Sequence, residues 1–280
     1  MDETIFEVLT IAKPATIAEA VHLAKIVSKL SPMVGNLIEF RSVEELNKRA
    51  EYKPHGIWKR QDPGFPDTVF EGKISPQPGF EIKAWFPLAT EITARFKDSQ
   101  KHFVQDHTYV AMLAWLPEKI IFGRPKILDV LVVSGQSVAA ARDEHYHNPP
   151  DYLVIEPEDT STRTRNLQQT NTAGYKFQDD AKKFAEAKKI VDSWGEGGHK
   201  YRHAADYQRR LRDLLSKYTY RLDTNFAKMD RIEHTGIEEF KKKVLKRVVE
   251  GNTIEKWAQI IAAEDENILA AAIEKLVKKT

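Results

Sequence analysis

The chain has 280 residues, of which 43 are Lys or Arg and 41 are Asp or Glu, so its formal net charge is +2. It contains no cysteine, which excludes disulfides, thiol nucleophiles and thiolate metal sites. The acidic N-terminus, Met-Asp-Glu-Thr, lacks the features of a signal peptide, and no apolar run reaches the roughly 18 residues of a membrane span. We therefore expect a soluble, cytoplasmic protein that does not associate with membranes.

The predicted elements begin with helices. Apolar residues at helical spacing predict one helix over residues 15–30 and a second over 33–50, separated by Ser31-Pro32. Residues 55–79 are rich in Gly and Pro and contain one short strand, Thr68 to Phe70. Alternation of apolar and polar residues then predicts a strand from Phe80 to Phe86.

Further strands are predicted at residues 109–116, 126–133 and 152–155, and helices alone after about residue 178, at 180–194, 201–218, 237–250 and 253–278. This order predicts an α/β or α+β core over residues 1–180, followed by a helical C-terminal subdomain over 181–280. The charge follows the same division. Residues 181–280 carry 22 basic against 16 acidic side chains, a local net charge of +6, whereas the first 180 residues have a net charge of −4.

Two carboxylates and a lysine are expected to meet at the turn-rich region. Side chains at i and i+2 of a strand share a face, so Glu81 and Lys83 point the same way. If the connection over residues 73–79 lets the two strands pair as a hairpin, Asp67 lies beside Glu81. Paired carboxylates suit Mg²⁺, which stabilises charge on a scissile phosphate, and a nearby lysine can orient the attacking water. This chemistry is that of a phosphodiester hydrolase.

Pro66-Asp67, thirteen intervening residues and Glu81-Ile82-Lys83 resemble the PD-(D/E)XK nuclease superfamily, most of all its type II restriction endonucleases. The resemblance implies a restriction-endonuclease-like core with a mixed central sheet, Mg²⁺-dependent cleavage of double-stranded DNA, and a homodimer. It implies that Asp67 and Glu81 are metal ligands and Lys83 the catalytic lysine. Glu39, on the helix before the motif, matches the additional glutamate that many members carry.

The alternative interpretation of this motif is an exposed hairpin with a surface Glu/Lys pair. The aromatic flanks of the strand, Phe80, Trp85 and Phe86, favour burial instead, and buried Glu and Lys are rare unless paired or functional. A second Glu-x-Lys, Glu71-Gly72-Lys73, lies too near Asp67 and falls in a turn.

The segment from Thr160 to Gln178 contains no acidic residue and is rich in groups that read base edges, because Arg pairs with guanine and Asn or Gln with adenine. An ordinary polar loop is the alternative. The candidate DNA-binding residues are Arg163, Arg165, Asn166, Gln168, Gln169, Asn171 and Lys176.

Gly135-Gln136-Ser137-Val138-Ala139 approaches the Gly-x-Ser-x-Gly elbow of α/β-hydrolases, except that Ala139 replaces the final Gly of the motif. His199, His203 or His234 would be the candidate base, and nothing in the sequence selects one of them. A strand that ends at a serine-capped helix explains the same residues.

Two further polar features are less specific. Residues 143–147, Asp-Glu-His-Tyr-His, have no second cluster to complete a metal site and favour a surface loop. The basic C-terminal helices fit either contact with the DNA backbone or dimerisation.

The sequence thus predicts a Mg²⁺-dependent, sequence-specific double-stranded DNA endonuclease of the restriction type. A DNA repair or junction nuclease on the same core is the alternative enzyme. A catalytically silent DNA-binding protein is the alternative outside enzymes.

Overall fold

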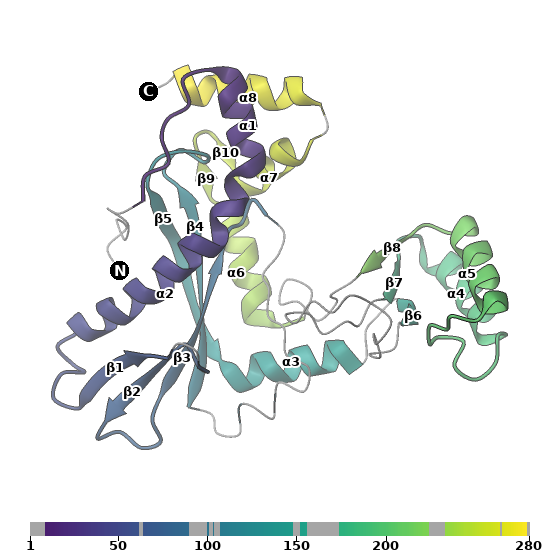
Figure 1. The fold of residues 1–280 in the computed structure, drawn as a ribbon, viewed down its shortest axis with the longest axis horizontal. Helices are drawn as coiled ribbons and strands as arrows, with labels where there is room; N and C mark the ends of the chain where they lie inside the picture. Colours follow the sequence, from purple (N-terminus) through teal and green to yellow (C-terminus); the bar gives the residue numbers. More distant parts are fainter. Residues whose placement is uncertain are drawn as a thin grey trace. The chain divides into compact units, whose positions relative to one another are not determined.

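The computed structural model describes residues 9–61, 64–89, 100, 103, 107–147, 152–155, 174–223, 233–263 and 265–278. The chain divides into two compact units. Unit 1 comprises residues 1–92, 100–139 and 233–280, and unit 2 comprises residues 93–99 and 140–232. Figure 1 shows the helices and strands of both units.

Unit 1 contains a five-stranded mixed sheet in the order β1-β2-β3-β4-β5. The strands are β1 (Gly56–Arg60), β2 (Thr68–Gly72), β3 (Gly79–Trp85), β4 (Thr108–Pro117) and β5 (Pro125–Ser134). Neighbouring strands are antiparallel except β3 and β4, which run parallel with Glu81 opposite Val110. The mixed α and β class and the mixed central sheet are confirmed.

The place of β4 between β3 and β5 explains its sequence. It reads as a nearly continuous apolar run, and all its residues except Tyr109 are buried. A strand that is covered on both faces needs apolar side chains on both. The sequence does not predict β1, because its five residues fall within the Gly- and Pro-rich region, but the buried Trp58 anchors it in the core.

The N-terminal helices are α1 (Ile17–Ile26) and α2 (Ser31–Lys48), joined by the short 3₁₀ helix η1 (Val27–Leu30). Thr16 and Glu19 form a capping box at the start of α1. Pro32 lies in the first turn of α2, where a missing N–H costs no hydrogen bond, so a new helix can begin there. α2 packs on β1 and β3.

The C-terminal helices belong to unit 1 and not to a separate subdomain over 181–280. They are α6 (Thr235–Leu245), α7 (Ile254–Ala262) and α8 (Glu266–Lys278). α6 packs against β5, with Phe240 against Trp85 of β3, and α8 packs against α1. The boundary between the two units therefore differs from the predicted one.

The predicted helix over 237–250 is shorter in the structure and ends at Leu245. Two short strands, β9 (Val248–Val249) and β10 (Asn252–Thr253), follow it and pair with each other. The turn between them contains Glu250 and Gly251, both at positive φ, a conformation that no helix accommodates.

Unit 2 has its own small sheet, in the order β6-β7-β8, and its own core. Its elements are the end of α3 (Gly135–His147), β6 (Tyr152–Ile155), β7 (Gly174–Phe177), α4 (Ala181–Asp192), α5 (Ala205–Lys217) and β8 (Tyr220–Asp223). β8 contradicts the prediction that strands end near residue 178. Its four residues are too few to show a period against the helices around them. In the described ranges, no helix combines the length and the apolar character that a membrane crossing requires.

The core of unit 2 yields a prediction about its independence. Leu211 of α5 is 2% exposed and lies in one cluster with Leu153, Val191 and Leu214. Leu211→Ala should therefore destabilise unit 2 by about 2–5 kcal/mol. In hydrogen exchange, amides of β7, α4 and α5 should become less protected while those of β3 and β4 keep their protection.

The neighbouring Arg212 is exposed and supplies the matched control. Arg212→Ala should leave both sets of amides protected as in the wild type. If Leu211→Ala reduced protection equally in β4 and α5, the division into two units would be contradicted.

Candidate active site

The β2–β3 hairpin forms as predicted and brings Asp67 to Glu81. Thr68 pairs with Phe80 in antiparallel register, so Asp67, one residue earlier, lies opposite Glu81. The backbone N–H of Ile82 donates a hydrogen bond to Asp67 Oδ2 over 2.5 Å. The Asp67 carboxylate is thereby fixed against the middle of β3.

Lys83 completes the cluster from the same face of β3 as Glu81. Its Nζ donates a hydrogen bond to Glu81 Oε1 and lies 3.8 Å from Asp67 Oδ2. The exposed fractions of the three side chains are 20% for Asp67, 9% for Glu81 and 22% for Lys83. The expected meeting of two carboxylates and one lysine is therefore present, and the Glu/Lys pair is not a surface pair.

One oxygen of the Glu81 carboxylate has no partner in the described part of the chain. Oε1 is bound by Lys83, but Oε2 is buried and accepts no hydrogen bond from the described residues. A buried carboxylate oxygen without a donor is costly. A divalent cation bound by Glu81 and Asp67 would satisfy it, because Mg²⁺ takes one or two carboxylates and keeps several waters. The two acids therefore fit Mg²⁺, although no group of three His, Cys, Asp or Glu suited to a metal occurs among the described residues.

The surroundings of Asp67 favour its acid form more than water does. Burial raises the pKa of Asp67 above the ordinary value, and the ammonium of Lys83 opposes this rise. Glu81 raises the pKa further, whereas the Ile82 N–H and the guanidinium of Arg60 lower it. The net rise means that desolvation outweighs the effect of the nearby cations on this carboxyl.

Glu39 lies on α2, before the hairpin, as the motif implies. Its Oε1 accepts a hydrogen bond from Arg60 Nε over 2.6 Å, and the two side chains are 18% and 32% exposed. Sequence reasoning missed Arg60. Its place depends on the pairing of β1 with β2, which sets Arg60 opposite Thr68, next to Asp67.

Most of the predicted base-reading segment lies outside the described residues. This applies to Arg163, Arg165, Asn166, Gln168, Gln169 and Asn171. Lys176 lies on β7 and is half-buried. The role of these residues in DNA binding stays a prediction.

The serine elbow does form a Ser–His contact, but of the wrong kind for hydrolysis. Ser137 Oγ lies 3.0 Å from His234 Nε2, and His234 Nδ1 accepts the N–H of Ile237 as the N-cap of α6. With Nδ1 as an acceptor, a neutral ring carries its proton on Nε2 and donates to the serine instead of deprotonating it. The contact is part of a helix cap.

Residues 143–147 are not the surface loop that the sequence predicts. α3 continues to His147, and Asp143 is 6% exposed. The run of polar residues hides this helix end, because a buried acid breaks the apolar period by which a helix is found in a sequence.

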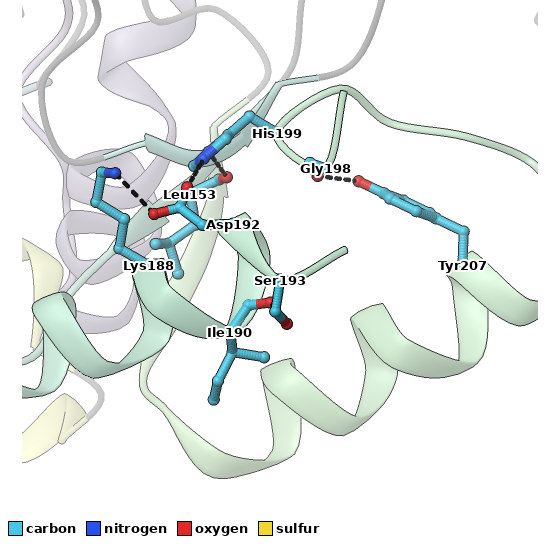
Figure 2. Close-up of polar contacts among 8 residues, drawn as sticks. All are labelled: Leu153, Lys188, Ile190, Asp192, Ser193, Gly198, His199 and Tyr207. Atoms are coloured by element: carbon cyan, nitrogen blue, oxygen red, sulfur yellow. Dashed lines mark hydrogen bonds and ion pairs between the residues drawn. The ribbon is translucent and has the colours of Figure 1, made fainter. Parts of the chain in front are cut away.

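A second polar cluster lies in unit 2 and fixes the segment after α4 (Figure 2). The His199 ring lies between two acceptors, with Nε2 at 2.7 Å from Asp192 Oδ1 and Nδ1 at 2.9 Å from the Leu153 carbonyl oxygen. The Tyr207 hydroxyl donates to the Gly198 carbonyl oxygen over 2.9 Å, and burial raises the pKa of Tyr207 to about 12. A phenol that stays protonated and a histidine engaged on both sides hold a loop in place, so this cluster is structural.

Compared with known proteins, the chain matches no family model, no curated protein and no solved structure.

The raised pKa of Asp67 predicts how stability changes with pH. Between the unfolded and folded pKa values of this carboxyl, the folded state binds more protons, so the free energy of unfolding falls as pH rises through that window. Asp67→Asn removes this ionisation and keeps an oxygen that can accept the Ile82 N–H. At neutral pH the variant should therefore be more stable than the wild type. This difference in the free energy of unfolding should become smaller at pH values below the ordinary pKa range of a carboxyl group. Urea unfolding at a series of pH values measures it.

Asp67→Ala is the control, because it removes the ionisation and also the acceptor of the Ile82 N–H. It should be about 1–3 kcal/mol less stable than Asp67→Asn at every pH. An Asp67→Asn variant that is less stable than the wild type at neutral pH would show that burial is not the dominant effect on this carboxyl.

Proposed function

We propose that this protein is a Mg²⁺-dependent, sequence-specific double-stranded DNA endonuclease of the type II restriction class, acting as a homodimer. The observation that carries the proposal is the buried Glu81 carboxylate, with one oxygen bound by Lys83 and the other without a partner among the described residues, beside Asp67. A polar cluster that is buried at this cost and left partly unsatisfied is typical of functional sites. The mixed sheet with α2 on it is compatible with the restriction-endonuclease-like core that the motif resembles.

In this proposal Asp67 and Glu81 hold the cation. A bound Mg²⁺ supplies charge stabilisation at the scissile phosphate and a more acidic water. Lys83 donates to Glu81, so in this arrangement its ammonium acts as a hydrogen-bond donor. It can orient the attacking water and offset the negative charge of the phosphate. The Ile82 N–H keeps Asp67 directed toward β3.

The first test of this function is cleavage of supercoiled plasmid DNA with Mg²⁺. Glu81→Gln and Lys83→Ala should each lower the cleavage rate by about 100-fold or more, because each removes a charged group from the reacting centre. Discrete fragments would indicate a site-specific enzyme, and a smear would indicate a nonspecific or junction nuclease. The absence of cleavage by the wild type would indicate a catalytically silent DNA-binding protein.

The chain contains its own matched control for this test. Glu71-Gly72-Lys73 repeats the Glu-x-Lys pattern, but the Glu71 side chain is 47% exposed and pairs with Lys59 over 2.5 Å. Glu71→Gln and Lys73→Ala should therefore cleave as the wild type does. Full activity in Glu81→Gln or Lys83→Ala would reject the site.

Exposed arginines of unit 2 supply a surface for the DNA backbone. Arg209, Arg210 and Arg212 lie on α5, away from its buried face of Tyr207, Leu211 and Leu214. The three form no ion pair with other described residues, whereas Lys183 and Lys188 of α4 are paired with Asp179 and Asp192. Unpaired guanidinium groups on a helix are suited to phosphate contact.

Neutralising Arg209, Arg210 and Arg212 together, as Gln, should weaken DNA binding equally for all sequences. The slope of log affinity against log salt concentration should fall by about 0.9 for each phosphate that these side chains neutralise. The comparison is with Lys25, Lys48 and Lys278 changed to Gln, which removes the same charge from side chains already paired with acids. An equal slope in both triple variants would show that the α5 arginines are only solvated.

A further inference from the structure

Arg60 is a charged neighbour of the proposed metal site that lies outside the sequence motif. Its Nε donates to Glu39 Oε1 over 2.6 Å, and no other cation of the described residues pairs with Glu39. The pair joins α2 to the end of β1 and is partly buried, with side chains 32% and 18% exposed. Glu39 is therefore bound by a cation of the protein itself.

The sheet fixes Arg60 beside Asp67. Arg60 pairs with Thr68 across β1 and β2, and the next residue, Gln61, donates its N–H to the Asp67 carbonyl oxygen over 2.8 Å. The guanidinium is close enough to Asp67 to lower the pKa of that carboxyl. Arg60 consequently acts on two of the acids at this end of the hairpin.

We infer that Arg60 is a positioning residue that withholds Glu39 from the metal, so that the DNA-free protein binds its cation through Asp67 and Glu81 alone. The inference rests on the proposed function. It also departs from the role that the motif gives Glu39, because a carboxylate in a partly buried ion pair with a permanent cation is not a free ligand. Metal affinity is then limited by Arg60 because its ion pair with Glu39 keeps that carboxylate from binding the cation.

The ion pairs among these side chains determine how each substitution should change the metal affinity. The acids Glu39, Asp67 and Glu81 are met by two cations, Lys83 and Arg60. Removing Arg60 leaves Glu39 without this cation and able to bind the metal as a third carboxylate, which should tighten binding of a divalent cation by about tenfold or more. Removing Glu39 from the wild type should change the affinity little, because its charge is already offset by Arg60 and it is not a ligand.

The experiment is calorimetric titration of Mn²⁺ into the full chain without DNA, so the readout is the dissociation constant and not activity. Arg60→Gln should bind Mn²⁺ about tenfold more tightly than the wild type. Glu39→Gln should bind within about threefold of the wild type, but in the Arg60→Gln background it should abolish the tenfold increase. Arg60→Lys, which keeps the charge, should stay close to the wild type.

The matched control is the Arg41–Glu44 pair of α2, at 2.7 Å, in which Arg41 is about as exposed as Arg60. Arg41→Gln changes the net charge as Arg60→Gln does and should leave the Mn²⁺ affinity unchanged. Weaker binding in Arg60→Gln, or tenfold weaker binding in Glu39→Gln with Arg60 present, would overturn the inference. If Arg60→Gln does not fold, the Glu39→Gln result alone decides. A wild type that binds no Mn²⁺ would instead reject the proposed metal site itself, which distinguishes the two failures.

Discussion

The hydrogen bond from the Ile82 N–H to Asp67 Oδ2 joins the parts of the candidate site. It exists because β2 and β3 pair antiparallel in a register that leaves Asp67 just beyond the ladder, beside a backbone donor of β3. β3 is also held on its other side by β4 along seven residues, from Gly79 to Trp85. A one-residue slip of β3 would turn Glu81 and Lys83 to the opposite face. The register therefore determines the chemistry as well as the packing.

The same arrangement is unfavourable for the fold taken alone. Glu81 is buried with its charge met by one lysine, and burial disfavours the ionised form of Asp67. Breaking a buried ion pair is costly, yet replacing both partners by apolar groups is often neutral or stabilising. Aromatic contacts around the hairpin, such as Trp58 with Phe70 and with Phe80, offset this cost. The proposed function explains why a site of this kind is kept inside an otherwise apolar sheet.

The hairpin could be predicted because its information is local. Alternation marks β3, the Pro- and Gly-rich connection marks the turn, and the two-residue period places Glu81 and Lys83 on one face. Arg60 could not be found in this way. Its place depends on the pairing of β1 with β2 and on the packing of α2, which are contacts between segments that no local period encodes. The boundary between the units differed from the predicted one for the same reason, since Phe240 reaches Trp85 across more than half the chain.

The path of the chain explains why the boundary between the two units differs from the predicted one. It also explains how different roles can be assigned to the two units. The chain leaves unit 1 after Ala139, forms most of unit 2, and returns to unit 1 at Glu233. Unit 2 has its own core, so substitutions within unit 2 do not have to alter the packing of the β2–β3 hairpin. Under the proposed function, the predicted base-reading segment and the α5 arginines both belong to this insertion, whereas Asp67, Glu81 and Lys83 belong to unit 1. Residues proposed to select a DNA sequence could then change without altering the buried charged side chains that are proposed to cleave it.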